Sequence, residues 1–564
     1  MVLIVFGRSL FQGYAPLDDP FLIVNNLAIR GLSFENLWLI FTSYDPEIYI
    51  PFTLFTYQIS YMIGELNPFG YHLVNLLFHS ANAILVVSVM MKLTKNKAAS
   101  IFVGLIFAIH PINTQVAVWI TGRKDLLYTL FFLLSFLQYI RFRSGNSRVY
   151  IWSIICLVLA ILAKPMAVTL PAVLVLYDMF FGEQKIEKKY LKEMLPYFAL
   201  SLIFIVIAII GKERIVGSTP IWEILIMSEK SITFYLQKFF LPTGLSIFYP
   251  YRGEITLLSL NFIIPTLITV ALIAIAVRSF RRKPWAAFGI LFFLITLSPT
   301  FFNIKTGGVV LFATDRYAYL PLIGILFLIA KVIDKYKFNP RYALATGGIV
   351  IALFSLLAMR QTKVWDTPEG LFMQALEAYP ESVSARTALS TLYRESGQYE
   401  KAFEVLKDGL EYDDHINLHI AAGTVYANVG QIPDAVDQFE KAMEMDPENP
   451  EPYFSLGSIR EQTGNKIAAM VNYEQAVERD PSYVPSRTNL ANLYFEQGRT
   501  EDALEQLEIA LDWNPSSLSA HKIMVRILME QGNVIEARKH VKKVLQLEPN
   551  NSEANSIYNA IKDL

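Results

Sequence analysis

The segment YAPLDDPF, residues 14 to 21, places two adjacent carboxylates, Asp18 and Asp19, directly after an apolar stretch. A positioned carboxylate can accept a proton from a poor nucleophile such as a hydroxyl group. Ionisable groups near a membrane are also costly and usually serve a site. The competing interpretation is an ordinary turn in which an aspartate caps the helix that starts after Pro20. Both interpretations stay open at this point.

Lys164 stands between two apolar runs and therefore needs an anionic partner, either a protein carboxylate or a bound phosphate. Two arginines or lysines are typical for one phosphate. We place Lys164 and Arg316 first among the cations that could bind a phosphate, with Arg123 and Lys124 as further members. The alternative is that these cations lock a helix bundle by pairing with Asp315, Asp125 or Asp178.

Histidines add a third polar set. His72, Asn75 and His79 recur at three and four residues and therefore share one helix face. They lack a nearby carboxylate, so hydrogen bonds between helices are favoured over a metal site. The single cysteine, Cys156, excludes a disulfide within the chain and a CxxC metal motif. No metal site is predicted, and His72, His110 and Asp315 are kept as supporting residues of a substrate site.

Composition indicates which elements must position these groups. The chain has 564 residues, of which 53% are hydrophobic and 18% charged, and its mean hydropathy is +0.37. Soluble proteins of this length rarely reach such values, so most of the chain must face lipid. The apolar runs stop near Gln361, where a polar and periodic sequence begins. Two domains are therefore predicted, residues 1–360 and 361–564.

The first domain contains eleven candidate membrane spans, some shorter than the roughly 20 residues of an isolated span. The first is short and has no basic flank or cleavage site, so we interpret it as a clipped span. Residues 221–241 carry four charges and are interpreted as a surface helix. The candidates lie near residues 1–13, 70–91, 98–110, 126–140, 149–163, 165–181, 195–211, 257–277, 285–302, 317–333 and 342–359.

The loop charges predict the orientation of these spans. Alternate loops are rich in lysine and arginine, which favours the cytoplasmic side. The intervening loops, notably 14–69, are poor in these residues for their length. The N-terminus is then cytoplasmic, and Asp18, Asp19 and everything after residue 360 lie outside. A start without a targeting signal and the absence of cysteines from the external domain suit a prokaryotic plasma membrane. The basic loops contain Lys92, Lys95 and Lys97; Arg141, Arg143 and Arg148; Lys185, Lys188, Lys189 and Lys192; Arg278, Arg281, Arg282 and Lys283; and Lys331, Lys335, Lys337 and Arg341.

The second domain is a repeat array. Glycines at 397, 430, 464, 498 and 532 are spaced by 33 or 34 residues, and alanines five residues later repeat the spacing. This period is typical of tetratricopeptide repeats, in which two antiparallel helices form each unit. Five units are predicted over about 383–551, after a half unit ending at Pro380 and before a polar cap at 552–564.

Such an array normally binds a peptide or protein partner in a groove formed by the first helix of each unit. Asn428, Ser458 and Asn492 are candidate groove residues. Residues 383 to 564 carry 17 lysines and arginines against 29 acids, a net charge of −12, while the whole chain has a formal net charge of −1. The array should repel phosphates, which argues against a nucleic-acid partner.

Four motifs carry a resemblance to a known family. They are LNPFGYHLVNLLFHSANA (66–83), FAIHPINTQVAVWITGRKDLL (107–127), LAKPMAVTLPAVLVLYD (162–178) and ATDRYAYLPLIG (313–324). Together with the repeats they resemble the transmembrane and tetratricopeptide-repeat O-mannosyltransferases and their prokaryotic relatives, over nearly the whole chain.

The resemblance implies an all-α, GT-C-like helix bundle followed by an α-solenoid. It also implies a glycosyltransferase that takes a sugar, mannose or another hexose, from a polyprenyl-phosphate and passes it to serine or threonine hydroxyls of a protein on the outer face. An acidic pair in the first outer loop carries catalysis in such enzymes, which corresponds to Asp18 and Asp19. A direct displacement would invert the sugar.

Two positions depart from the family pattern. Gln115 stands where HPxxxE has an acid, and Ile50 replaces the arginine of YRP. Loss of a carboxylate weakens the case for a divalent metal, whose ligands are mostly acids. It also supports an alternative, a membrane-anchored scaffold with a degenerate transferase half. A transporter is less favoured, since no paired inverted halves are evident.

Overall fold

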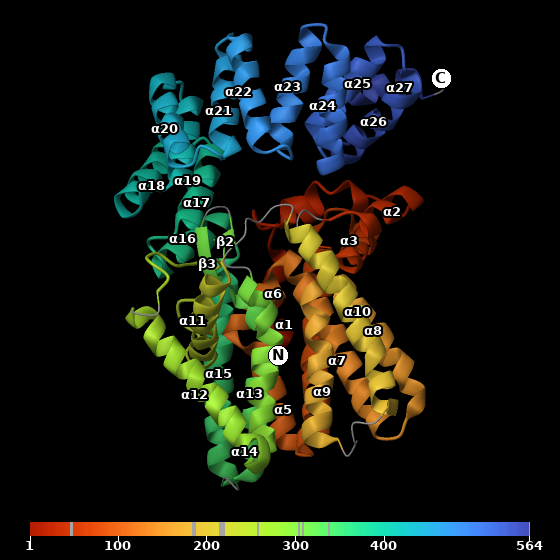
Figure 1. Ribbon diagram of the computed structural model, residues 1–564, viewed down its shortest axis with the longest axis vertical. Coiled ribbons are helices and arrows are strands. Elements are labelled where there is room, and N and C mark those ends of the chain that lie inside the picture. The colour runs from red at the N-terminus through yellow and green to blue at the C-terminus, as the bar shows by residue number, and fades with distance from the viewer. Residues whose placement is uncertain are drawn as a thin grey trace. The chain divides into compact units, whose positions relative to one another are not determined.

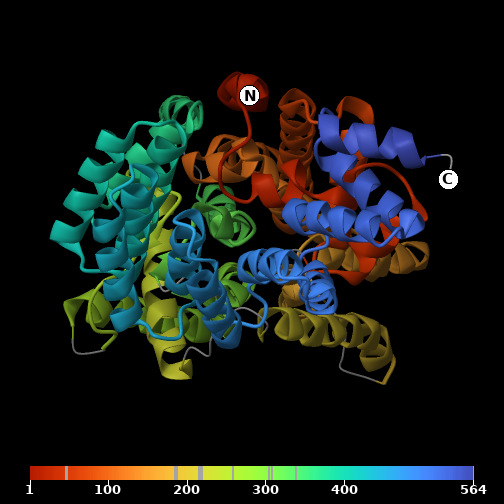
Figure 2. The ribbon, with the colours of Figure 1, turned by 90° about the horizontal axis from the view of Figure 1, so that it is seen from above.

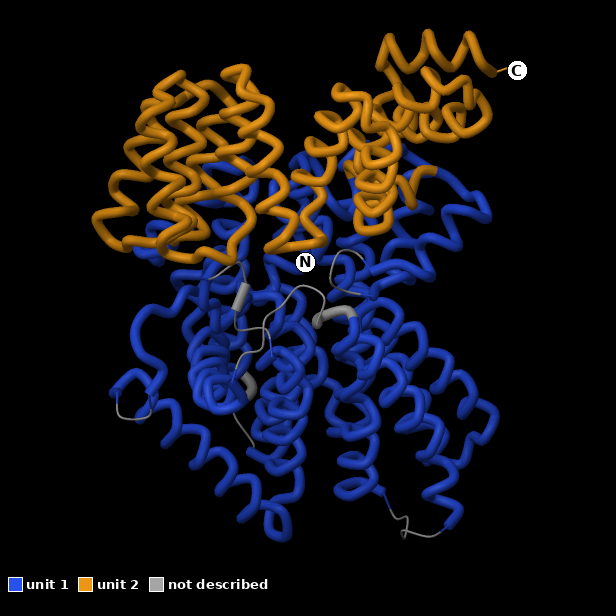
Figure 3. The backbone as a smooth tube through the Cα atoms, turned by 45° about the horizontal axis from the view of Figure 1, so that its top comes forward, with its two compact units in different colours: residues 1–23, 31–382 blue, residues 24–30, 383–564 orange. Residues whose placement is uncertain are grey.

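The chain folds into two compact helical units in the computed structural model. Residues 1–44, 49–182, 188–213, 220–256, 259–302, 305–306, 309–336 and 339–562 are described. Unit 1 comprises residues 1–23 and 31–382, and unit 2 comprises residues 24–30 and 383–564 (Figure 3). This division falls at residue 382, whereas composition placed the boundary at residue 360.

Unit 1 is a helix bundle (Figure 1). Its α-helices are α1 (Val2–Phe6), α2 (Phe34–Thr42), α3 (Pro51–Gly64), α4 (Pro68–Thr94), α5 (Lys97–Ile109), α6 (Thr114–Val118), α7 (Arg123–Arg143), α8 (Tyr150–Ala163), α9 (Leu170–Phe181), α10 (Lys188–Glu213), α11 (Ile221–Phe240), α12 (Leu260–Arg282), α13 (Pro284–Leu297), α14 (Leu322–Lys335), α15 (Pro340–Val364) and α16 (Pro368–Ala378).

Short helical turns and one small sheet connect these helices. The sheet is antiparallel with the order β1-β3-β2, and it was not predicted from the sequence. Its strands are β1 (Tyr249–Pro250), β2 (Lys305–Thr306) and β3 (Val309–Ala313). The turns are η1 (Gly7–Phe11), η2 (Pro20–Val24), η4 (Pro111–Asn113), η5 (Ile120–Gly122), η6 (Ser147–Val149), η7 (Pro165–Thr169), η8 (Ser298–Phe302) and η9 (Asp315–Ala318).

All eleven segments predicted to span a membrane contain helix. By length and composition, six helices among the described residues can cross a membrane, or seven if α5 and the segment Pro111–Val118, bent by 50°, form one span. The protein is thus a multi-pass membrane protein, while the count of eleven stays a prediction. Lys185 and Lys337, two members of the predicted basic loops, lie outside the described residues. The six are Pro68–Thr94, Ile120–Arg143, Lys188–Ile210, Leu260–Arg282, Pro284–Phe302 and Arg341–Val364.

Glycines let two of the apolar helices pack closely. A Cβ atom on Gly324 of α14 would lie 2.6 Å from the carbonyl oxygen of Gly289 on α13. A Cβ on Gly289 would in turn lie 2.4 Å from a methyl group of Leu328. Membrane helices associate through such small residues because lipid provides little hydrophobic driving force.

Unit 2 confirms the repeat interpretation, with five antiparallel helix pairs over the predicted range. Gly397, Gly430, Gly464, Gly498 and Gly532 have φ between +72° and +86°, the left-handed conformation that ends a helix at low cost in glycine. Figure 2 shows the pairs following one another in a curved row. The pairs are α17 (Val383–Glu395) with α18 (Tyr399–Tyr412), α19 (Ile416–Asn428) with α20 (Ile432–Met445), α21 (Pro450–Gln462) with α22 (Lys466–Arg479), α23 (Val484–Glu496) with α24 (Thr500–Trp513), and α25 (Leu518–Glu530) with α26 (Val534–Leu547).

The array has the predicted ends. α16 supplies the half unit before the first pair and is counted with unit 1, and α27 (Ser552–Ile561) forms the cap. Residues 24–30 also belong to unit 2, where the turn η3 (Leu27–Ile29) packs on α26. The backbone N–H of Leu27 donates to Ser516 Oγ at 3.1 Å.

Candidate active site

The acidic pair lies on the turn between η1 and η2, and its two side chains point to different partners. Asp18 accepts a hydrogen bond from Lys124 Nζ at 2.7 Å. Asp19 accepts from the backbone N–H groups of Ala15 at 2.8 Å and Thr121 at 3.1 Å. These bonds connect Asp18 to α7 and Asp19 to Ala15 and to η5. Neither carboxylate caps the helical turn after Pro20. The capping interpretation is therefore wrong for both side chains.

Asp18 belongs to a cluster of buried cations. Lys124, at the start of α7, has 4% of its side chain exposed, while Asp18 keeps 41%. Burial raises the pKa of Asp18, but the positive charges of Lys124, Arg316 and Lys164 outweigh it and hold that pKa below its usual value. Asp18 therefore stays ionised at neutral pH.

Lys164 makes one of the ion pairs that the pairing alternative predicted, the pair with Asp125. Its Nζ donates to Asp125 Oδ1 at 2.6 Å, and both side chains are nearly inaccessible to solvent. The same Nζ lies 5.2 Å from the ring centre of Tyr317 and 5.6 Å from that of Tyr128. Asp178, the other proposed partner in this region, pairs with Arg143 at 3.1 Å instead.

Gln115, the residue that stands where the family pattern has an acid, positions Arg316. Gln115 Oε1 accepts from the backbone N–H of Arg316 at 2.9 Å and from Thr314 Oγ1 at 3.1 Å. The guanidinium carbon then lies 5.0 Å from the Trp119 ring centre and 5.4 Å from that of Tyr317. The amide of Gln115 thus holds the Arg316 loop without needing a negative charge.

The cluster contains more basic than acidic side chains. Its three cations, Lys124, Lys164 and Arg316, face two carboxylates, Asp18 and Asp125, which form ion pairs with the two lysines. Such a group can stabilise an anion that gains charge in a water-poor site. Phosphate is one such anion.

Asp19 has a different environment. It is completely buried, and burial raises its pKa to about 7, although the N–H groups of Ala15 and Thr121 favour the charged form. The pair therefore combines one carboxylate that is ionised at neutral pH with one that titrates there. A carboxylate with a pKa near the working pH is suited to accept and release a proton.

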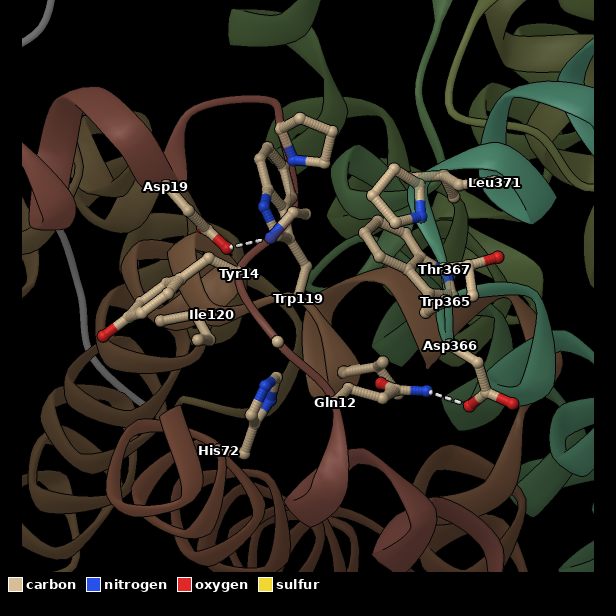
Figure 4. Close-up of a pocket in the computed structure, with 15 residues that line it drawn as sticks. Gln12, Tyr14, Asp19, His72, Trp119, Ile120, Trp365, Asp366, Thr367 and Leu371 are labelled. Carbon is tan, nitrogen blue, oxygen red and sulfur yellow. Dashed lines mark hydrogen bonds between the residues drawn. The ribbon is translucent and has the colours of Figure 1, made fainter. Parts of the chain in front are cut away.

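A cleft lies beside Asp19 (Figure 4). Its aromatic wall is formed by Trp119 and Trp365, whose ring centres are 6.1 Å apart. Gln12 Nε2 donates to Asp366 Oδ1 at 2.9 Å across it. The lining residues are Gln12, Gly13, Tyr14, Ala15, Pro16, Asp19, His72, Val118, Trp119, Ile120, Trp365, Asp366, Thr367, Pro368 and Leu371.

Arg123 lies apart from the other cations. It is fully buried, and its nitrogens donate to Asn75 Oδ1, Ser60 Oγ and the carbonyl oxygens of Thr56 and Tyr71. The guanidinium also stacks on the ring of Tyr57, 4.7 Å from its centre. These contacts occupy its donors, so the geometry does not favour Arg123 as a phosphate ligand.

The histidine face makes the predicted hydrogen bonds between helices. His79 contacts the Tyr319 hydroxyl at 2.7 Å and the Ala108 carbonyl at 3.1 Å, and Asn75 donates to the carbonyls of Trp119 and Ile120. His72 is the member that lines the cleft.

The other two supporting residues lie in structural positions. His110 Nδ1 accepts from the N–H of Ile112 at 3.2 Å, and its Nε2 contacts the Phe239 carbonyl at 3.0 Å. Asp315 accepts from the Tyr249 hydroxyl at 2.6 Å. Burial raises the pKa of Asp315 to about 7, against the effect of that hydrogen bond. Neither side chain lines the cleft.

The proposed groove residues lie on first helices of successive pairs. Ser458 on α21 and Asn492 on α23 occupy equivalent positions 34 residues apart, and Asn428 ends α19. Asn492 Oδ1 accepts from Arg526, the residue one repeat further on. Asn428 is exposed, and its amide donates to the Thr424 carbonyl at 2.8 Å. Their role in binding stays a prediction.

Sequence reasoning missed several cleft residues. Trp119 lies inside a motif quoted for the resemblance, but its position between the cations and the cleft required the fold. Asp366 pairs with Arg8, 358 positions earlier in the chain. The signal that could have drawn attention to it is the sequence WDTP, residues 365–368, where the apolar run ends.

No group of three or more His, Cys, Asp or Glu side chains lies close enough to hold a metal ion within the part of the chain that the structure describes. At the acidic pair itself, Asp18 is engaged by Lys124 and Asp19 by two N–H groups. The donors present at this turn do not fit a divalent cation, which takes six or more oxygen ligands.

Comparison with known proteins finds matches to both the helix bundle and the repeat array. The tetratricopeptide-repeat family matches residues 371–404, 450–483 and 467–527. The chain is 23% identical over 505 residues to human protein O-mannosyl-transferase TMTC3, covering 78% of this chain and 54% of that protein. It is 36% identical over 172 residues to human protein O-mannosyl-transferase TMTC2, covering 29% of this chain and 20% of that protein.

Among solved structures, the tetratricopeptide-repeat protein YrrB is similar at 21% identity, covering 34% of this chain and 98% of YrrB, with a TM-score of 0.25. The chain spans about half the length of the full-length curated relatives it matches. The resemblance predicted from the sequence motifs is confirmed: the chain is similar to the protein O-mannosyl-transferases TMTC1 to TMTC4, and it has tetratricopeptide repeats in its C-terminal part.

Proposed function

We propose that the protein is an integral-membrane glycosyltransferase of the GT-C type. It transfers a hexose, with mannose as the first sugar to test, from a polyprenyl-phosphate donor to serine or threonine hydroxyls of a protein acceptor. The observation that carries the proposal is a pair of unlike carboxylates, Asp18 and Asp19, of which Asp18 lies among three cations. Lys124 pairs with Asp18, Lys164 pairs with Asp125, and Arg316 is half-buried.

The proposed reaction is a single displacement at the anomeric carbon. The acceptor oxygen bonds to this carbon as its bond to the phosphate oxygen breaks, and the polyprenyl phosphate leaves with the electron pair. The hydroxyl proton passes to Asp19, whose pKa of about 7 suits that transfer. Lys124, Lys164 and Arg316 stabilise the charge gained by the phosphate. Asp18 holds Lys124 in place.

We further propose that the site lies on the extracytoplasmic face, with the N-terminus in the cytoplasm. In Figure 1 the α12–α13 and α14–α15 junctions, which carry basic residues, lie at one end of unit 1, while β2 and β3 lie at the other. Arg316, in η9, lies three residues after the end of β3. The described lysines and arginines that flank those two junctions lie at the end of unit 1 away from β3, which agrees with the positive-inside rule. The repeat array then presents the protein acceptor on the outer side.

Sugar release from labelled polyprenyl-phosphate-sugars by the detergent-purified full chain tests the proposal. The Asp18→Asn/Asp19→Asn double variant should lose transfer by about 100-fold or more, since general-base catalysis alone contributes roughly that factor. Asp437→Asn, an exposed carboxylate on α20, is the matched control and should transfer normally. Equal turnover in the double variant and the wild type would refute the proposed mechanism.

A scaffold without activity is the second candidate, and Gln115 in place of an acid is the observation that favours it. The hydrogen bonds that Gln115 makes to Arg316 and Thr314 give its amide a positioning role, which weakens that argument. Absence of turnover with every donor, together with no rise in thermal stability on adding any of them, would favour the scaffold.

A further inference from the structure

Part of the loop that follows the acidic pair folds with the repeat array. Residues 24–30 belong to unit 2, whereas the chain on both sides of them belongs to unit 1 (Figure 3). The turn η3 packs on α26, and the N–H of Leu27 donates to Ser516 Oγ at 3.1 Å. Leu27 and Ile29 are completely buried. The last helix pair of the array and the turn before it therefore hold a short segment from the N-terminal part of the chain.

Ser516 lies in the turn before α25 and makes a different contact from its equivalent in the preceding repeat. Ser482, 34 residues earlier, donates from its Oγ to Asp480 Oδ1 at 2.6 Å. Asn514 stands in place of this aspartate in the last repeat, and Ser517 provides the cap of α25. The hydroxyl of Ser516 accepts a hydrogen bond from the loop. Two serines at equivalent positions of the array thus have different partners.

The docked segment is a compact element with hydrogen bonds of its own. Asn26 Oδ1 accepts from the N–H of Ala28 at 2.9 Å. The guanidinium of Arg30 donates to the carbonyl oxygen of Val24, which closes the segment on itself. Such local bonds between side chains and backbone restrict the conformations of a short segment. We therefore expect the segment to move as one body.

The docked segment is joined to the acidic pair by a helical turn. This turn, η2, starts directly after Asp19, and within it the N–H of Leu22 donates to the carbonyl oxygen of Asp18 at 3.0 Å. The boundary between the two units falls inside η2. Asn25 alone separates η2 from Asn26, which caps η3. A shift of the docked segment should therefore reach the two carboxylates with little slack to absorb it.

We propose that Leu27 and Ser516 are positioning residues: the last repeat docks residues 24–30 and thereby holds the turn that carries Asp18 and Asp19. The effect on turnover rests on the proposed transferase function, whereas the docking and its effect on the turn are measurable without it. Placement of a catalytic group matters because a shift of about 1 Å costs on the order of 100-fold in rate. The repeat array then supports the acidic pair in addition to any partner that it binds.

Hydrogen–deuterium exchange of the detergent-purified full chain tests the docking. Ser516→Ala removes the acceptor of the Leu27 N–H, so exchange in peptides that cover residues 24–30 should become about tenfold faster. Ser516→Thr keeps the hydroxyl and should exchange as the wild type does. Ser482→Ala is the matched control, because it removes the equivalent hydroxyl one repeat earlier, and it should leave residues 24–30 unchanged.

The same experiment reports on the acidic turn without any assay of activity. The N–H groups of Ala15 and Thr121 donate to the Asp19 carboxylate, so their exchange is slow while that carboxylate is in place. Ser516→Ala should speed exchange in the peptides that contain these two residues. Ser516→Thr and Ser482→Ala should not.

Transfer is then measured on the same variants. Ser516→Ala should lower kcat about fivefold and change the KM for the donor by less than about twofold, because a misplaced catalytic group affects the transition state and not substrate binding. The pH of half-maximal transfer should rise by about half a unit, since the N–H groups that favour ionised Asp19 are displaced. Loss of active protein alone cannot shift that pH. Ser516→Thr and Ser482→Ala should transfer as the wild type does.

Two results would overturn the positioning role. One is equal exchange of residues 24–30 in Ser516→Ala and the wild type, which would show that the bond to Leu27 does not hold the segment. The other is faster exchange there with an unchanged kcat and pH of half-maximal transfer. If the wild type turns over no donor, faster exchange both at residues 24–30 and at the two Asp19 donors would support the positioning role and refute the transferase function instead.

Discussion

Asp19 should destabilise the folded protein at the pH where it is proposed to act. Its folded-state pKa is about 7 against an ordinary value of 3.8, a difference of roughly three units at 1.36 kcal/mol per unit. Because the folded-state pKa is raised, the ionised form is disfavoured in the fold. The penalty is small below pH 4, grows as the pH rises to 7 and stays constant above it, at about 4 kcal/mol.

Asp19→Asn removes this pH-dependent penalty. The asparagine also loses one of the two backbone hydrogen bonds from Ala15 and Thr121, at a cost of about 1–3 kcal/mol that does not depend on pH. The variant should therefore be less stable than the wild type near pH 4 and more stable at pH 8, while losing transfer at every pH. The assay is the midpoint of thermal unfolding of the detergent-purified protein, measured from pH 4 to pH 8.

Asp18→Asn is the matched control because the pKa of Asp18 is shifted in the direction opposite to that of Asp19. The folded-state pKa of Asp18 is lowered, by cations that outweigh burial. Its charge therefore stabilises the fold above its unfolded pKa, and this stabilisation is lost as the pH falls through the folded value. Asp18→Asn should lose most stability at neutral pH. Parallel stability curves for the wild type and Asp19→Asn across pH 4 to 8 would refute the assignment of a raised pKa to Asp19.

Substitutions at two further positions test the cation cluster and the residue that departs from the family pattern. Lys164→Met leaves Asp125 buried and without its ion-pair partner, and should cost about 3–5 kcal/mol of stability, measured as a fall in the thermal midpoint; an unchanged midpoint would show that the ion pair contributes nothing. Gln115→Glu keeps the acceptor for the Arg316 N–H and should keep transfer. Gln115→Leu leaves this part-buried N–H without its partner, at a cost of about 1–3 kcal/mol of stability. Equal transfer rates in these two variants would exclude the positioning role of Gln115.

The repeat array could be predicted from the sequence almost completely. Each helix pair of a tetratricopeptide repeat contacts mainly its neighbours, so the 34-residue spacing of Gly430, Gly464, Gly498 and Gly532 determines both helix ends and their order. The attachment of residues 24–30 to unit 2 could not be predicted. It depends on a contact between Leu27 and Ser516, 489 positions apart, and neither residue has a local signal for it.

The sequence could predict which residues belong to the candidate site, but not which of them pair with one another. A buried charge in a membrane protein must be compensated, so the residue types alone indicate Asp18, Asp19, Lys164 and Arg316 as site candidates. Which cation serves which acid depends on how the helices bring distant segments together. Arg123 illustrates the difference: it adjoins Lys124 in sequence, but successive residues of a helix point about 100° apart, so its guanidinium enters a separate cage of carbonyls and tyrosine rings.

The same geometry explains why two adjacent acids can have unlike roles. Asp18 and Asp19 lie on a turn whose successive side chains diverge, one toward the N-terminus of α7 and the other toward the N–H of Thr121 in η5. The N-terminal end of α7 places Lys124 beside Asp18, whereas the backbone turn before it offers Asp19 only neutral donors. One carboxylate is thereby compensated by full charge and the other only by dipoles. For that reason the pKa of Asp18 is lowered and the pKa of Asp19 is raised. Two adjacent residues of the same type can therefore serve as an ionised partner for Lys124 and as a proton acceptor.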